Sequence, residues 1–125
     1  VFRVFRGQPP LMPAQLSTHV LDLTSGRPAA GLTIELWSLG AAPRLLKTVK
    51  TNADGRTDEP LLDAGAIAAG SYELVFHVCD YFAGRGVGCV FLDRVPVRFS
   101  IPDASAGCHV PLLVTPWAYS TYRGS

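Results

Sequence analysis

Short apolar segments separated by prolines and glycines are the feature that most constrains the fold of this chain. The sequence places 10 prolines and 12 glycines among 125 residues. Both residue types interrupt regular structure, so the apolar segments between them are too short for long helices. This spacing is typical of many short strands joined by turns, and it predicts an all-β sandwich or barrel of about eight strands.

Seven segments are expected to form strands, namely 16–23, 32–39, 44–50, 71–78, 94–101, 108–115 and 117–122. A further short strand is expected after Arg56. Turns are predicted at 24–28, 52–55 and 102–107, where Gly, Pro, Asn, Asp and Ser gather. One short helix is expected over 79–85 and should end at Gly86, whereas 62–69 fits a loop or a helical turn.

Composition limits the kinds of partner that the chain can bind. Hydrophobic residues make up 48% of the sequence and charged residues 17%, and the formal net charge is +1. Without a basic stripe the chain lacks the usual electrostatic basis for binding nucleic acid. No apolar run approaches the roughly 20 residues needed to cross a bilayer. We therefore expect neither a nucleic-acid nor a membrane partner.

The length suits one domain, which we expect over residues 16–125. Residues 1–15 are expected to be a poorly ordered leader or linker, because prolines at positions 9, 10 and 13 prevent a regular ladder.

Apolar alternation predicts which strands need cover. In 32–38 and 94–101, apolar and polar side chains alternate, which indicates one dry and one wetter face. The segment 108–115 differs, because Val110, Leu112 and Val114 share one side while Pro111 and Leu113 share the other. A strand that is apolar on both sides needs cover on both sides. We therefore predict a homo-oligomer built on the C-terminal strands.

Three cysteines, Cys79, Cys89 and Cys108, are widely spaced and odd in number. This pattern is unlike a disulfide framework or a zinc site. Three free thiols in a reducing compartment are the first interpretation, and one bridge with one free thiol is the alternative.

Three histidines are the first candidates for acid–base chemistry. His19 and His109 lie among small polar or turn residues of two expected strands. His77 shares parity with Glu73, so it is expected to face solvent or to pair locally. A zinc trio from the three is disfavoured, because no two of them have the sequence spacing of metal ligands. We therefore expect no metal.

Arg56 follows the predicted turn at 52–55, where a fixed guanidinium either caps carbonyl groups or binds an anionic or carbonyl-rich ligand. The C-terminal residues Tyr122, Arg123, Gly124 and Ser125 continue directly from an apolar strand. This ending presents a phenol, a guanidinium and a carboxylate, which together can bind a small polar molecule. The sequence has no Gly-x-Ser-x-Gly nucleophile motif, phosphate loop or dinucleotide fingerprint.

Five segments together resemble the 5-hydroxyisourate hydrolases of the transthyretin family. They are Leu-Ser-Thr-His-Val-Leu-Asp at 16–22, Gly-Arg-Pro-Ala-Ala-Gly at 26–31, Thr-Asn-Ala-Asp-Gly-Arg at 51–56, His-Val-Pro-Leu-Leu at 109–113 and Tyr-Ser-Thr-Tyr-Arg-Gly-Ser at 119–125. The resemblance covers nearly all of 16–125, and its terminal Tyr-Arg-Gly-Ser distinguishes the hydrolases from the hormone-carrying transthyretins.

The resemblance implies a transthyretin-like sandwich of two four-stranded sheets with one short helix. It implies a homotetramer, a dimer of dimers, with active sites between the dimers. The implied reaction is hydrolysis of 5-hydroxyisourate to 2-oxo-4-hydroxy-4-carboxy-5-ureidoimidazoline in urate degradation, without a metal or an organic cofactor. Relatives occur in cytoplasm, peroxisome and periplasm, so the compartment is left open.

The resemblance also assigns residues to the site. It implies catalytic roles for His19, Arg56 and His109. The implied substrate-binding residues are Thr121, Tyr122, Arg123, Gly124 and Ser125.

Two other functions remain as alternatives from the sequence. The first is a transthyretin-like carrier that holds a small aromatic ligand in the tetramer channel without turnover. The second is an interaction domain attached to a larger protein.

Overall fold

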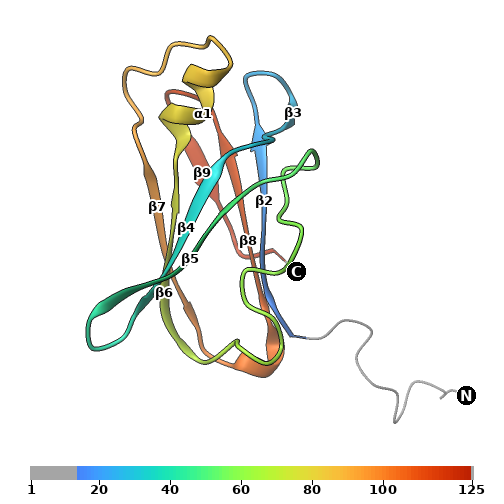
Figure 1. Cartoon of the computed structure of the whole chain (residues 1–125), viewed down its shortest axis with the longest axis vertical. Helices are drawn as coiled ribbons and strands as arrows, with labels where there is room; N and C mark the ends of the chain where they lie inside the picture. The colour runs from blue at the N-terminus through green and yellow to red at the C-terminus, as the bar shows by residue number, and fades with distance from the viewer. Residues whose placement is uncertain (1–13, 125) are drawn as a thin grey trace, which may run out of the picture.

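Two four-stranded sheets form a sandwich in the computed structural model, which describes residues 14–124 (Figure 1). The first sheet has the order β3-β2-β8-β9, with β2 at Leu16–Asp22, β3 at Arg27–Pro28, β8 at Cys108–Val114 and β9 at Tyr119–Thr121. The second has the order β5-β4-β6-β7, with β4 at Thr33–Leu39, β5 at Pro43–Lys50, β6 at Gly70–Phe76 and β7 at Val95–Ile101. The predicted all-β sandwich of about eight strands is confirmed.

Alternation of buried and exposed side chains explains why these segments are strands. Along β2 every second residue is buried, and β4 and β7 follow the same rule over most of their length. The buried faces of the two sheets meet in one core that includes Leu16, Ile34, Leu74, Phe76 and Leu112. Each such side chain contributes about 1.5–3 kcal/mol relative to an exposed position. The dry and wet faces predicted for 32–38 and 94–101 are confirmed.

The parallel pairing of β2 with β8 determines where the polar side chains of the first sheet lie. Ser17 is opposite His109, and His19 is opposite Pro111. Paired residues on neighbouring strands point to the same face of a sheet. Their neighbours Leu16, Thr18, Val20, Val110 and Leu112 are buried, so Ser17, His19 and His109 share the outer face.

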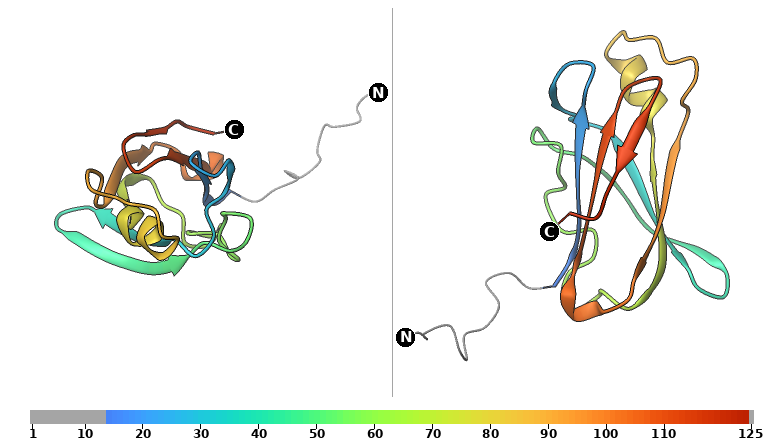
Figure 2. Two further views of the ribbon diagram at one scale, coloured as in Figure 1. Left: turned by 90° about the horizontal axis from the view of Figure 1, so that it is seen from above. Right: turned by 180° about the vertical axis from the view of Figure 1, so that it is seen from behind.

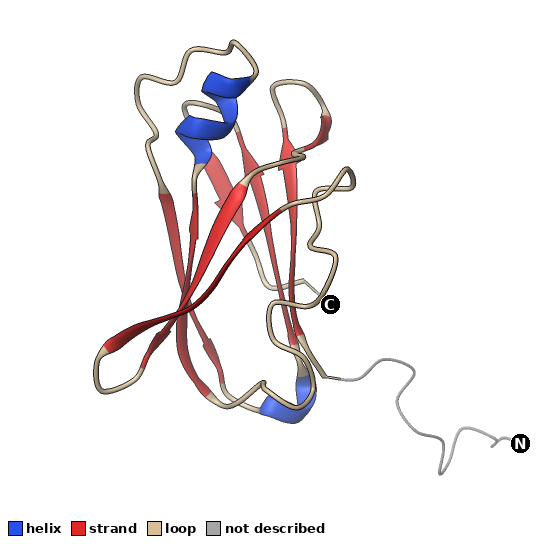
Figure 3. Cartoon of the chain, in the orientation of Figure 1, coloured by secondary structure: helices blue, strands red, loops and turns tan. Residues whose placement is uncertain are grey.

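Helix α1, at Val78–Gly84, lies at one end of the sandwich (Figures 1 and 3). The Tyr81 hydroxyl donates a 2.9 Å hydrogen bond to Asp22 Oδ2, which fastens the helix to the end of β2. Gly86 follows the helix with φ at 73°, a conformation that favours glycine. The predicted helix and its glycine stop are therefore confirmed, with bounds shifted by one residue.

Two predicted strands need correction. The short strand expected directly after Arg56 is absent, because residues 57–61 form an irregular loop with bends, and Leu62 makes an isolated bridge to Leu16. Pro60 has no N–H to offer a ladder, and Asn52 bonds Asp58 locally instead. The last strand is also shorter than the predicted 117–122.

That last strand begins late because of a side chain in the turn before it. Thr115 Oγ1 accepts hydrogen bonds from the backbone N–H groups of Trp117 and Ala118, at 3.1 and 3.0 Å. These bonds hold the first two predicted strand residues in the turn, so β9 begins at Tyr119.

Sequence reasoning missed β3, whose two residues lie within the turn predicted at 24–28. Arg27 and Pro28 pair with Asp22 and Leu21 at the outer edge of β2, a position where proline is tolerated. Of the leader predicted over 1–15, only Ala14 and Gln15 lie within the described residues. No helix among residues 14–124 is long and apolar enough to cross a membrane.

The outer face of the first sheet is open in a single chain. Figure 2 shows β9 at the edge of this sheet, with the C-terminal segment returning along it. Trp117, Tyr119 and Tyr122, in β9 and the residues beside it, are exposed by 63%, 44% and 59%. Three large aromatic side chains in water on one edge favour cover by a second molecule.

Candidate active site

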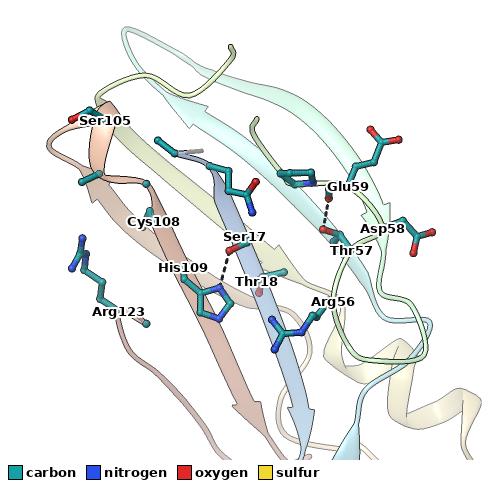
Figure 4. A pocket seen from close by; sticks show the side chains of 16 residues that line it. Ser17, Thr18, Arg56, Thr57, Asp58, Glu59, Ser105, Cys108, His109 and Arg123 are labelled. Carbon is teal, nitrogen blue, oxygen red and sulfur yellow. Dashed lines mark hydrogen bonds between the residues drawn. The ribbon is translucent and has the colours of Figure 1, made fainter. Parts of the chain in front are cut away.

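An open cleft of about 940 Å³ lies where the parallel strands β2 and β8 begin (Figure 4). Four segments far apart in the sequence line it. They are the start of β2, the loop at 56–60, the residues that lead into β8 and the C-terminal segment. The cleft therefore forms only when the chain folds and brings these four segments together.

His109 occupies the middle of the cleft, and Ser17 holds its ring (Figure 4). Ser17 Oγ lies 2.8 Å from His109 Nδ1, a hydrogen bond between residues 92 positions apart. The parallel register explains the contact, because it places these two residues directly opposite each other. The bond uses Nδ1 and so leaves Nε2 as the ring nitrogen for a ligand.

The surroundings of His109 favour a neutral ring. Its pKa lies below the usual 6.5, mainly because partial burial disfavours the charged form. The positive charges of Arg56 and His19 lower this pKa further, whereas hydrogen bonding to Ser17 acts in the opposite direction. At neutral pH the side chain is therefore a free base that can accept a proton.

Arg56 is placed beside His109 by a tight turn. Asn52 Oδ1 accepts hydrogen bonds from the backbone N–H groups of Asp54 and Arg56, at 2.9 and 3.2 Å. Gly55 then lies against β2, where its carbonyl accepts a 2.8 Å hydrogen bond from the Val20 N–H.

Only glycine fits at position 55. Its φ is 73°, and an added Cβ would collide with the Val20 carbonyl oxygen. Gly55 therefore sets how closely the turn approaches β2, and with it the position of the Arg56 guanidinium.

The C-terminal segment closes the other side of the cleft. Gly124 N–H donates a 2.8 Å hydrogen bond to the His109 carbonyl, continuing the register of β8 and β9. A Cβ at Gly124 would collide with His109 Cδ2. The segment thus lies directly against the imidazole, and Arg123 lines the same cleft.

The structure brings together four of the eight site residues predicted from the sequence. Arg56, His109, Arg123 and Gly124 line the cleft. His19 does not line it within one chain, but lies on the same face of the sheet, one alternation further along β2, near enough for its charge to act on His109.

The remaining predicted site residues lie apart from the cleft or outside the described residues. Thr121 donates its hydroxyl to the Pro111 carbonyl at 2.7 Å, so this hydroxyl supports the β8–β9 pair. Tyr122 is exposed, and Ser125 lies outside the described residues.

Several cleft residues were missed by sequence reasoning. Ser17 was not predicted as a site residue, although it lies two positions from His19 in the same strand, a spacing that places both side chains on one face. Cys108 also lines the cleft, where burial raises the pKa of its thiol. Asp58 and Glu59 also line the cleft.

His77 lies outside this cleft. Its Nε2 is 2.7 Å from Glu35 Oε2, and its side chain is only 12% exposed. Of the two expected alternatives, solvent exposure or local pairing, the structure shows pairing, although the partner Glu35 lies 42 positions away in the sequence. Within residues 14–124, no three His, Cys, Asp or Glu side chains converge in a way that could hold a metal ion.

An imidazole beside a guanidinium, in a cleft on the outer face of a two-sheet sandwich, defines a protein with the equipment for acid–base chemistry. The HIUase/Transthyretin family model matches residues 16–124. The chain belongs to this family.

Named relatives agree with the match. "5-hydroxyisourate hydrolase 2" of Rhizobium meliloti (strain 1021) is 55% identical over 115 residues, covering 89% of this chain and 96% of the relative. The solved Klebsiella pneumoniae 5-hydroxyisourate hydrolase is 38% identical with a TM-score of 0.76, and the match covers 90% of this chain and 100% of that one. A crystal structure of (S)-allantoin synthase is 40% identical with a TM-score of 0.84, covering 91% of this chain and 44% of that one.

Proposed function

We propose that this chain is a hydrolase that opens 5-hydroxyisourate by breaking a C–N bond of a cyclic amide. The product is 2-oxo-4-hydroxy-4-carboxy-5-ureidoimidazoline, which places the reaction in urate degradation. The observation that carries the proposal is a neutral imidazole held by Ser17 beside the Arg56 guanidinium. The relatives named as 5-hydroxyisourate hydrolases support it.

His109 is the general base in this proposal. The proposal uses the tautomer with the proton on Nδ1, which faces Ser17 Oγ at 2.8 Å. In this tautomer the Nε2 lone pair accepts a proton from water as the water attacks a ring carbonyl. A lowered pKa keeps the base free at neutral pH. General-base help of this kind accelerates reactions by roughly 10²–10⁴-fold.

Arg56 stabilises the negative charge that develops on the carbonyl oxygen. The turn holds the Arg56 backbone beside the cleft, so its guanidinium is already close to the place where that charge appears. The same cation keeps His109 neutral in the free enzyme. One residue thus supports both the base and the transition state.

His19 and the C-terminal segment complete the site. His19 lies on the same face of the sheet and takes part in returning the proton to the departing nitrogen. Thr121, Tyr122, Arg123, Gly124 and Ser125 form the substrate-binding end. Gly124 contributes by letting the chain lie against the imidazole.

The working unit is a homotetramer, a dimer of dimers. The exposed aromatic edge at Trp117, Tyr119 and Tyr122 and the open outer face of the first sheet favour cover by other copies. A second dimer over this face would turn the open cleft into a closed site that admits the reacting water but is shielded from bulk solvent. Sedimentation should give a mass about four times the chain's 13.4 kDa.

The decisive assay generates 5-hydroxyisourate in place from urate with urate oxidase, then adds the purified chain. We expect the absorbance of the intermediate to decay faster than its spontaneous loss. A folded tetramer that leaves this decay unchanged would instead support a carrier that holds its ligand without turnover. If conditions that dissociate the tetramer also abolish the activity, the result would support an active site shared between copies of the chain.

A further inference from the structure

Two of the three cysteines meet at the helical end of the sandwich, away from the cleft. Cys79 lies in the first turn of α1, and Cys89 lies in the loop that joins α1 to β7. The Cys79 thiol donates to the Cys89 carbonyl, with the sulfur 3.3 Å from the oxygen. The backbone N–H of Cys79 donates to the Asp93 carbonyl at 2.9 Å, which holds the loop against the helix.

Cys79 also acts on the thiol of Cys89. Burial raises the pKa of the Cys89 thiol above its usual range, and the hydrogen bond and charge of Cys79 raise it further. Cys89 donates its own proton to the Leu92 carbonyl at 2.9 Å. Both side chains are only half-buried, so a small molecule in solution can reach them.

We propose that Cys79 and Cys89 are a reversible redox site that closes to an intramolecular disulfide on reaction with a small-molecule disulfide. Cys108, in the cleft, is not part of the pair. This inference is independent of the proposed hydrolase activity, because neither thiol lines the cleft.

The chemistry is two successive thiol–disulfide exchanges. One thiolate of the pair attacks a sulfur of oxidised glutathione, forms a mixed disulfide and releases one glutathione thiolate. The second thiolate attacks the protein sulfur of that mixed disulfide and expels the second glutathione. The pair loses two protons and two electrons, and the electrons reduce the glutathione disulfide. Only the weak thiol hydrogen bonds to the Cys89 and Leu92 carbonyls are lost.

Closure would fix a loop that already reaches a second part of the molecule. Leu92 N–H donates to the Pro116 carbonyl at 3.2 Å, in the turn between β8 and β9. The rings of Phe91 and Trp117 stack with centroids 6.3 Å apart, and both are exposed. A Cys79–Cys89 bond would therefore join α1 covalently to the loop that supports this turn.

The test treats the full chain with oxidised glutathione, blocks remaining thiols and digests with trypsin without reduction. Each cysteine falls in a different expected peptide, 57–85 for Cys79, 86–94 for Cys89 and 99–123 for Cys108. We expect peptides 57–85 and 86–94 to be linked, and 99–123 to carry the blocking group. Thermal unfolding of the oxidised chain should occur about 5–10 °C higher, because the bond restricts the unfolded chain.

Three variants make the result decisive. Cys79→Ser and Cys89→Ser should each leave a glutathione adduct on the remaining partner and abolish the thermal shift. Cys108→Ser should keep both the link and the shift. Stable glutathione adducts on Cys79 or Cys89 of the parent chain, without the linked peptides, would overturn the proposal. Links that join either cysteine to Cys108 would also overturn it.

Discussion

Two strand-associated histidines bond an oxygen at nearly the same distance, yet they lie in opposite electrostatic surroundings. His109 meets the Ser17 hydroxyl at 2.8 Å, with the cationic Arg56 close by. His77 meets the Glu35 carboxylate at 2.7 Å, and Asp80 lies 3.8 Å from its other nitrogen.

The charged groups around each imidazole explain why His109 is suited to catalysis and His77 to holding the fold together. A neighbouring cation and partial burial keep His109 neutral, so it can take up a proton. His77 instead contacts two carboxylates, Glu35 in β4 and Asp80 in the first turn of α1, so it links β4 to the start of the helix. The pairing also helps to lower the pKa of Glu35, although the hydrogen bond from Trp37 is the larger cause.

Replacing each histidine in turn by glutamine should show the difference between them most clearly. His109→Gln should lower kcat/KM for 5-hydroxyisourate by roughly 10²–10⁴-fold, because the base is lost. His77→Gln should retain near-parental turnover. Both should keep the β-rich circular dichroism spectrum. A folded but inactive His77→Gln chain would mean that the wrong imidazole was assigned.

Removing the cation beside His109 should change both rate and pH dependence. Arg56→Ala should lower kcat by roughly 10²–10³-fold, because stabilisation of the developing oxyanion is lost. As the pH is lowered, the remaining activity of Arg56→Ala should begin to fall at a higher pH than that of the parent, because Arg56 lowers the pKa of His109. Arg98→Ala is the matched control, since Arg98 pairs with Glu73 at 3.2 Å in the other sheet. An unchanged acidic limb in Arg56→Ala would contradict this account.

Adding one methyl group to the C-terminal segment tests how tightly His109 is held. Gly124→Ala should reduce kcat by roughly 10–100-fold, because the new Cβ displaces the ring from its working position. Gly40→Ala is the control, because a Cβ at Gly40 meets no atom within 4 Å. Steady-state kinetics should separate the two variants, and equal activities would show that this contact does not position the ring.

The smallest effect should come from the ion pair at His77. Glu35→Gln should lower the free energy of unfolding by about 1.5–3 kcal/mol at neutral pH, the range for a hydrogen bond to a charged group. The lowered pKa of Glu35 means that its contribution is present above the usual 4.5 and is lost as pH falls through the native value. Urea titrations from pH 7 to 3 should therefore show a flatter acid slope for the variant below pH 4.5.

His109 should produce a separate loss of stability at higher pH. Its pKa is lower in the folded chain than the usual 6.5, so the unfolded chain binds the proton first as the pH falls. The parent and Glu35→Gln should share this decline below pH 6.5, and His109→Gln should lack it.

Much of the fold could be predicted from local pattern. Alternation identified β4 and β7, because a buried strand face demands an apolar side chain at every second position. Gly86 marked the end of α1 through a backbone conformation that glycine adopts without strain. The predicted strands were wrong where a local contact outweighed the sequence pattern. Hydrogen bonds to Thr115 delay the start of β9, and the two-residue β3 forms by pairing at the edge of β2.

The site shows a sharper division. The sequence by itself determined that the chain contains histidines that can act as a base, a cationic Arg56 and a polar C-terminal segment. It also determined which residues of one strand share a face. Only the tertiary structure decided that Ser17 and His109, 92 positions apart, pair in parallel register, and that Cys79 and Cys89 meet across a loop. Side-chain alternation fixes the face that each residue takes within its own strand. The neighbouring strand and its register depend on how all the buried faces fit together in the core.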